Sequence, residues 1–292
     1  MKLATLIIGG ESALAVISAE DDVFWAVEDL TGRYFPAMTD LIGVYDSVKA
    51  KLTPKGPGRP MAEAEIAAPL KPPRNVMCVG KNYRAHAHEF TRSGFDSSAK
   101  DASEAIPTAP IIFTKAPETV IGPGQDILYP TGLSEQIDYE AELGVVIGKP
   151  GKGISKAQAL DHVFGYVIIN DMTARDLQAK HKQWFIGKSL DTFCPMGPWL
   201  VTADEIEVAN LDVRCWVNDE LRQDANTKDL IFDVPTLIET LSAGLTLLPG
   251  DVIATGTPAG VGIGFTPPRF LSRGDEVAIE ITGLGRLSNR VA

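Results

Sequence analysis

Residues 138–148 read DYEAELGVVIG, and this stretch organises the rest of the chain. Its apolar part is rich in β-branched residues and ends in glycine, so we predict a strand here. Side chains two positions apart on a strand point the same way, which places Glu140 and Glu142 side by side. Neighbouring like charges repel, and the pair therefore needs a counter-charge if it is buried.

A second strand is predicted where residues 165–171 read GYVIIND, and its apolar run stops at Asp171. Functional side chains are common at the ends of strands. Three carboxylates converging at the end of a buried sheet would favour a divalent cation held by oxygen ligands. We therefore predict a metal site made of Glu140, Glu142 and Asp171. In the alternative interpretation the glutamates lie on a solvated strand face and Asp171 caps the next helix.

The following residues 171–178, DMTARDLQ, are compatible with a helix. Such a helix would place Asp171, Arg175 and Gln178 on one face, at i, i+4 and i+7. Such an alignment of a carboxylate, a guanidinium and an amide at the end of a strand is more typical of a functional site than of an ordinary solvent-exposed surface.

Residues 82–89, NYRAHAHE, carry a histidine and a glutamate three positions apart. One helical turn would bring His86 and Glu89 to the same face, where the carboxylate would orient the imidazole as a general base. The alternative is a solvated pair on a polar turn. His88 falls on another face of this turn, and we do not expect it to act.

Lys188 lies in a short segment, FIGKS, that is similar to part of a phosphate-binding loop. That loop requires a glycine five residues before Gly187, where this chain has Lys182, so we reject the match. A lysine between apolar segments should instead have an anionic partner or bind a substrate carboxylate.

Taken together, these segments resemble the fumarylacetoacetate hydrolase family, in its branch of bacterial acylpyruvases and 2-hydroxyhepta-2,4-diene-1,7-dioate isomerases. Five motifs occur in the family's order and cover about residues 71–292: NYRAHAHE at 82–89, DYEAEL at 138–143, NDMTARDLQ at 170–178, GKSLDTFCP at 187–195 and ATGTPAGVG at 254–262.

The fold class that we predict is mainly β with short helices (α+β), and the resemblance implies the family's mixed β-sandwich roll. Strand-like runs and a helix-like spacing precede a segment rich in proline and glycine, so we expect a small N-terminal αβ domain at 1–70 and a catalytic domain at 71–292. The resemblance also implies a homodimer.

The resemblance assigns roles to several of these residues. His86 and Glu89 correspond to the family's catalytic dyad, and Lys188 and Thr257 to residues that hold the substrate. Some members carry a further metal-binding carboxylate where this chain has Thr114 and Lys115, so we expect three protein ligands. Three carboxylates without a cysteine or histidine ligand favour Mg²⁺ or Mn²⁺.

The function that we predict is metal-dependent hydrolysis of a C–C bond in an acylpyruvate-like diketo acid, a small anionic substrate, by way of a metal-bound enolate. His86 would activate water, and Arg175 and Gln178 would bind the substrate and stabilise the oxyanion. The same site could serve an isomerase or a decarboxylase of 2-oxo or 2-hydroxy-diene dicarboxylates, as in aromatic or sugar acid catabolism. A rival from another class is a non-catalytic protein that a metal stabilises.

Composition excludes other classes. A net charge of −11 with a pI near 4.9 argues against a nucleic-acid surface. No apolar run approaches the roughly 18 residues of a membrane span, and the N-terminus has no clean signal-peptide pattern. Three widely spaced cysteines fit neither a disulfide framework nor a zinc site. We therefore expect a cytoplasmic enzyme.

Residues 90–110 are small and polar without a firm period. Their position directly after the expected base suggests a lid that closes on the substrate, although a surface loop would have the same composition.

Overall fold

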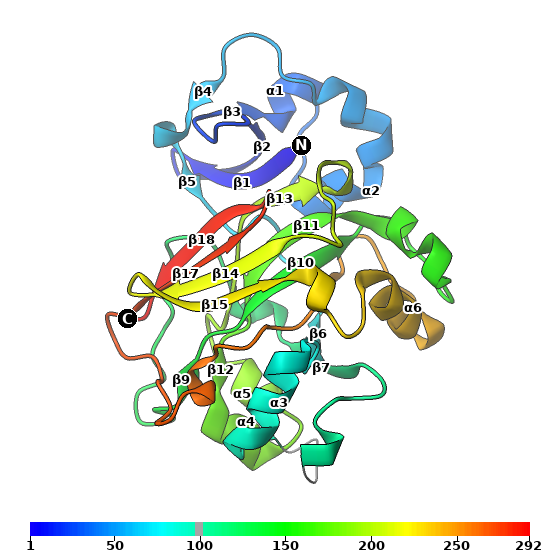
Figure 1. The fold of residues 1–292 in the computed structure, drawn as a ribbon. Helices are drawn as coiled ribbons and strands as arrows, with labels where there is room; N and C mark the ends of the chain where they lie inside the picture. Colours follow the sequence, from blue (N-terminus) through cyan, green and yellow to red (C-terminus); the bar gives the residue numbers. More distant parts are fainter. Residues whose placement is uncertain (97–101) are drawn as a thin grey trace.

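The computed structural model describes residues 1–96 and 102–292, and most of its regular structure is β (Figure 1). The largest sheet is mainly antiparallel and runs β4-β3-β2-β1-β13-β11-β10-β16-β6-β7, with β5 beside β1 and β8 beside β13. Its strands are β1 Lys2–Ile8, β2 Glu11–Ile17, β3 Val23–Ala26, β4 Arg59–Pro60, β5 Glu65–Ile66, β6 Val76–Gly80, β7 Ile111–Lys115, β8 Val120–Ile121, β10 Ala141–Ile147, β11 Val163–Asn170, β13 Cys194–Thr202 and β16 Val252–Ala254.

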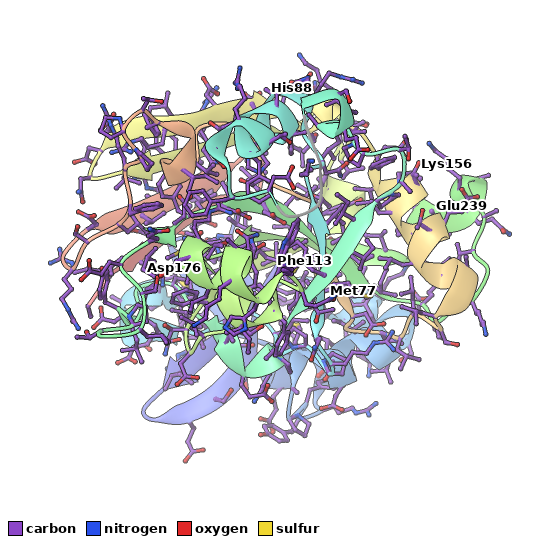
Figure 2. All side chains as sticks on the ribbon, turned by 90° about the horizontal axis from the view of Figure 1, so that it is seen from below. Met77, His88, Phe113, Lys156, Asp176 and Glu239 are labelled. Carbon is purple, nitrogen blue, oxygen red and sulfur yellow. The ribbon has the colours of Figure 1, made fainter. Side chains whose placement is uncertain are left out.

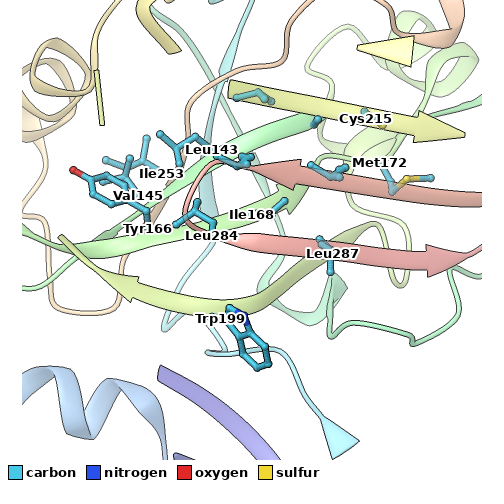
Figure 3. Close-up of a cluster of buried hydrophobic side chains, with 14 of the residues drawn as sticks. Leu143, Val145, Tyr166, Ile168, Met172, Trp199, Cys215, Ile253, Leu284 and Leu287 are labelled. Carbon is cyan, nitrogen blue, oxygen red and sulfur yellow. The ribbon is translucent and has the colours of Figure 1, made fainter. Parts of the chain in front are cut away.

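A smaller sheet of order β15-β14-β17-β18 packs over the middle of the large one. Its strands are β14 Asp212–Val217, β15 Glu220–Asn226, β17 Glu276–Ile281 and β18 Gly285–Arg290. Figure 3 shows Leu143 and Val145 of β10 and Ile168 of β11 in one buried cluster with Cys215 and Leu287 of the smaller sheet. The two sheets therefore share an apolar core, and the prediction of a mainly β fold with short helices is confirmed.

The helices are short. They are α1 Val27–Thr31, α2 Met38–Val48, α3 Arg84–Ser93, α4 Arg175–His181, α5 Phe185–Lys188 and α6 Val234–Gly244, with 3-10 turns at Lys49–Lys51, Met61–Glu63, Ala102–Glu104, Pro117–Thr119, Lys156–His162, Ala203–Glu205, Thr227–Asp229 and Gly262–Gly264. In Figure 1, α3, α4 and α5 gather at the end of the molecule opposite the N-terminal strands. None of the helices in the described ranges is long and apolar enough to span a membrane.

The N-terminal strands form an antiparallel meander, with β2 between β1 and β3. β1 also pairs with β13, where Lys2 lies opposite Val201, so the N-terminal segment is hydrogen-bonded into the large sheet. A domain boundary near residue 70 stays a prediction.

The positions of the carboxylates follow from the pairing of β10 with β11. The two strands are antiparallel and Ala141 lies opposite Asn170, so the start of β10 adjoins the end of β11. Just beyond that pair, the Asp171 amide donates to the Glu140 carbonyl at 2.9 Å. Gly144 permits this close pairing, because a Cβ there would lie 2.7 Å from side-chain atoms of Ile169 and Val167.

The predicted helix over residues 171–178 is wrong in its first turn. Thr173–Ala174 forms a short strand, β12, that pairs with β9 (Ile137–Asp138), and α4 begins only at Arg175. Pairing with a distant segment satisfies the backbone of residues 173–174 in an extended form, which a local helical pattern cannot reveal.

The segment predicted as a lid, residues 90–110, begins inside a helix. α3 continues to Ser93, with Phe90 buried on it, and a 3-10 turn spans Ala102–Glu104. The centre of the predicted lid, residues 97–101, lies outside the described residues.

Candidate metal and catalytic site

Three buried carboxylates meet where β10 begins and β11 ends. Glu140, Glu142 and Asp171 each offer one oxygen within 4.8 Å of the other two. Their side chains are 4%, 1% and 0% exposed, so the glutamates do not lie on a solvated face. The structure thus brings together the three residues that the sequence analysis grouped.

Two buried lysines neutralise part of this charge. Lys188 Nζ donates to Glu140 Oε2 at 2.7 Å and to Asp171 Oδ2 at 2.8 Å. Lys115 Nζ donates to the other Asp171 oxygen at 2.7 Å and to the carbonyls of Met172 and Lys188. Asp171 is therefore held between two lysines, and Lys115 stands where some relatives were expected to carry a fourth carboxylate.

Arg175 is the third cation of the site and is 1% exposed. Its Nε donates to Asp138 Oδ2 at 2.9 Å, and its Nη1 donates to Gln178 Oε1 at 3.1 Å. Its Nη2 lies 2.7 Å from Glu140 Oε1, close enough for an ion pair but without hydrogen-bond alignment. This N–H group therefore has an ionic partner in Glu140 but no hydrogen-bond acceptor among the described residues.

The pKa shifts follow this arrangement of charges. Burial would raise the pKa of Glu140, but Lys188 and Arg175 outweigh it and hold the pKa at about 2. Burial, and then the charges of Asp171 and Glu140, raise the pKa of Glu142 well above its usual range. Burial would lower the pKa of Lys188, yet Asp171 and Glu140 raise it.

Glu142 provides a test of whether a metal fits the site. Its Oε2 accepts a hydrogen bond from the Gly256 amide at 2.9 Å, and among the described residues no lysine or arginine lies within ion-pair distance of it. A buried carboxylate beside two others lacks a counter-charge that a divalent cation would supply. Hard oxygen donors without histidine or cysteine suit Mg²⁺ or Mn²⁺, so the residues fit such an ion.

The expected dyad forms on α3, close to the carboxylates. His86 is 4% exposed, and its Nδ1 lies 3.1 Å from Glu89 Oε2. The Gly260 amide donates to the other Glu89 oxygen at 3.0 Å, which fixes the glutamate against the glycine-rich turn. With Nδ1 turned to Glu89, the His86 Nε2 is the nitrogen left for proton transfer. His88 is exposed on the outer side of α3, as Figure 2 shows.

Thr257 lies at the same end of the sheet, where β16 runs into the glycine-rich turn. Its hydroxyl accepts a hydrogen bond from Gln223 Nε2 at 2.8 Å, and Gln223 Oε1 in turn accepts from the Ala141 amide at 3.0 Å. Gln223 therefore connects the turn directly to the first residue of β10.

One small cavity adjoins these groups, and Asp171, Lys115 and Glu89 lie behind its lining residues. It is lined by Val79, Gly80, Lys81, His86, Phe90, Phe113, Glu140, Glu142, Arg175, Gln178, Trp184, Lys188 and Thr257. Its volume, counted as the positions open to the centre of a water molecule, is about 10 Å³. That space suits roughly one water. The residues expected to hold metal, substrate and proton thus converge, with Glu89 behind His86.

Some residues of this region were not assigned a role from the sequence. Asp138 is fully buried and accepts from Arg175 and from the amides of Gly262 and Ile263, at 2.6 and 3.1 Å for the amides. Asp138 lies inside the DYEAEL motif, and this position could have marked it as a residue of the site. Lys115 and Trp184 come from segments distant in sequence, and no local pattern marked them.

Comparisons with known proteins identify the family of the chain. Residues 75–292 match the family described as fumarylacetoacetate (FAA) hydrolase, C-terminal. The chain is 54% identical over 234 residues to the oxaloacetate tautomerase YisK of Bacillus subtilis. The aligned region covers 79% of this chain and 74% of the relative.

Two solved structures are similar over the whole chain. A fumarylacetoacetate hydrolase from Exiguobacterium antarcticum has a TM-score of 0.84 at 40% identity, covering 100% of this chain and 99% of that one. A maleylpyruvate hydrolase from Sphingobium sp. SYK-6, in complex with manganese(II) and pyruvate, has a TM-score of 0.80 at 31% identity with the same coverage. The chain therefore belongs to the fumarylacetoacetate hydrolase family, whose members include hydrolases, isomerases and a tautomerase.

Proposed function

We propose that this protein is a divalent-metal-dependent enzyme that interconverts the keto and enol forms of a small 2-oxo dicarboxylic acid, with oxaloacetate as the first candidate. The observation that carries the proposal is that His86, paired with Glu89, lines the same cavity as Glu140, Glu142, Arg175 and Lys188. The 54% identity to an oxaloacetate tautomerase supports this choice of substrate.

Keto and enol forms differ by the place of one proton, which moves between an oxygen and the neighbouring carbon. His86 Nε2 is positioned to take the proton from one atom and return it to the other, because Glu89 holds Nδ1. Glu89 is itself anchored by the Gly260 amide, so the imidazole keeps one orientation.

The intermediate of such a transfer carries negative charge on its oxygen. Lys188 and the Nη2 group of Arg175 are the nearby positive donors that can stabilise it. Glu140, Glu142 and Asp171 would hold the metal ion, which when bound supplies positive charge to the oxygens of a 2-oxo acid. Thr257 and Gln178 are placed to orient the substrate.

A second candidate is the hydrolysis of an acylpyruvate-like diketo acid, in which His86 would deprotonate a water molecule. The specific observation in its favour is that the cavity leaves room for about one water beside the dyad. The likeness to a maleylpyruvate hydrolase supports it too. Decarboxylation of a 2-oxo diacid would use the same charges and is the third reaction to assay.

The test is a substrate panel with the purified chain in Mn²⁺, Mg²⁺ or EDTA. Enol decay and deuterium uptake at the carbon beside the carbonyl report on tautomerisation of oxaloacetate, and pyruvate release from acylpyruvates reports on hydrolysis. We expect metal-dependent acceleration of tautomerisation beyond that of buffer with the same metal. Hydrolysis without any such acceleration would select the second candidate, and no turnover of any 2-oxo acid would support a metal-stabilised, non-catalytic protein.

We also propose that the chain acts in the cytoplasm as a homodimer. The family resemblance supports the dimer, and light scattering after size exclusion would measure the mass in solution. A monomer at working concentration would contradict this part of the proposal.

A further inference from the structure

An aromatic wall closes the cavity on the side of α5. Trp184 is 6% exposed and meets Phe90 and Phe113 edge-on, with ring centroids 5.8 and 5.3 Å apart. Phe113 in turn lies under the Lys188 ammonium, which is 4.9 Å from the ring centroid. The wall therefore joins α3, β7 and α5 and touches a cation of the site itself.

The indole is packed tightly against Gly80 of β6, the strand beside β7. A Cβ on Gly80 would lie 2.6 Å from Trp184 Cζ3, so only a glycine leaves room for the ring. With the indole in this place, the cavity admits about one water, which is far less than any 2-oxo dicarboxylic acid occupies. A 2-oxo dicarboxylic acid can therefore enter only if part of the lining moves, and the aromatic wall supplies three of the lining residues.

The backbone that carries the indole is strained. Lys182 and Trp184 have φ values of 56° and 60°, which residues with a side chain rarely adopt. The Gln183 amide donates to the His181 carbonyl at 2.5 Å, and the Phe185 amide donates to the Gln183 carbonyl at 2.7 Å. Each bond spans two residues, so the segment makes two successive γ-turns of the strained kind with positive central φ. Strain of this kind is concentrated at ligand clamps and switch segments.

From these observations we infer that Trp184 is the residue that limits substrate size, with Phe90 and Phe113 as its supports. The inference rests on the proposed function, and it makes the indole the side chain that limits the size of the group beyond the 2-oxo acid. The indole swings aside on the strained turns to admit the acid and then packs against its far end. A longer or aromatic acyl group would meet the indole and prevent closure.

Binding by the Mn²⁺-loaded protein tests this without relying on turnover. The probes are oxalate, a small planar mimic of an enolised 2-oxo acid, and 4-phenyl-2,4-dioxobutanoate, which presents the same chelating end with a phenyl group beyond it. Calorimetry gives the dissociation constant of each. The variants are Trp184→Ala and the milder Trp184→Phe, and the matched control is Trp199→Phe, a buried tryptophan that packs in the core between the sheets.

In the wild type we expect oxalate to bind at least about tenfold more tightly than the phenyl acid, the scale on which pocket size discriminates. Trp184→Ala should bring the two dissociation constants within about threefold of each other, mainly because the phenyl acid binds more tightly. The ratio of the two constants for Trp184→Phe should lie between those of the wild type and Trp184→Ala. Trp199→Phe should keep the wild-type ratio. Oxalate should also change the tryptophan fluorescence of the wild type and of Trp199→Phe, but not that of Trp184→Phe.

The outcomes distinguish a failure of the size filter from a failure of the proposed function. If the folded Trp184 variants keep the wild-type ratio, or weaken both probes equally, the size filter is wrong and the proposed function is untouched. If Mn²⁺-loaded wild type binds neither probe, the proposed function and this inference fall together. If Trp184→Ala does not fold, the ratio of the two dissociation constants and the fluorescence response of Trp184→Phe test the size filter.

Discussion

Replacement of Glu142 by glutamine tests the central electrostatic claim, that this buried carboxylate lacks a counter-charge that a metal ion would supply. The change keeps the size of the side chain and its acceptor oxygen for the Gly256 amide, and it removes one buried charge. The neighbouring oxygens of Glu140 and Asp171 lie within 4.8 Å. At that separation two unit charges repel by ~3 kcal/mol at an effective dielectric constant of about 20.

The sign of the effect depends on pH and on the metal. In the metal-free protein the folded pKa of Glu142 is raised, so its protonated form stabilises the fold below the usual pKa of 4.5. That stability is lost as pH rises through the raised pKa, by at most ~1.4 kcal/mol per pH unit. Glu142→Gln does not titrate there, so we expect it to be the more stable protein in EDTA at about pH 8, with the difference shrinking toward about pH 5.

Metal acts in the opposite direction. An ion at a hundred times its dissociation constant adds ~2.7 kcal/mol to the wild type, whereas a hundredfold loss of affinity would leave the variant a gain of only ~0.4 kcal/mol. Urea unfolding with EDTA or Mn²⁺ measures both quantities, and Glu135→Gln, an exposed change nearby in sequence, is the control. The reasoning is refuted if Mn²⁺ stabilises Glu142→Gln as much as the wild type, or if the variant is the less stable protein in EDTA at about pH 8.

Three further predictions use the same protein. Asp138→Asn should lower the free energy of unfolding in urea by about 3 kcal/mol. The change removes the buried negative charge that pairs with Arg175, and it turns an amide group toward backbone N–H donors. A loss below about 1 kcal/mol would contradict this prediction. His86→Gln should lower kcat for the proposed proton transfer by about 10² to 10⁴ while calorimetry shows unchanged Mn²⁺ affinity, and a parallel loss of affinity would place His86 among the metal ligands. Exhaustive chelation should abolish turnover and added Mn²⁺ should restore it, so full activity in EDTA would remove the metal from the mechanism.

The local pattern of the chain was enough for the strands and for much of the site. β-Branched runs predicted β10 and β11, and the two-residue spacing of Glu140 and Glu142 predicted that they would act together. The i, i+3 spacing of His86 and Glu89 predicted their contact, because a single helical turn sets that distance whatever surrounds it. The family motifs added Lys188 and Thr257, which no spacing rule would have connected to the carboxylates.

Contacts between distant segments decided the rest. Pairing with β9 keeps residues 173–174 extended, so α4 begins only at Arg175 and Asp171 lies outside the helix that its neighbours suggested. Lys115 approaches Asp171 across 56 positions, and Trp184 reaches the cavity only because two strained turns aim it there. Sequence patterns report the preferences of neighbouring residues, whereas the pairing of a buried charge and the closing of a cavity depend on which strands lie side by side.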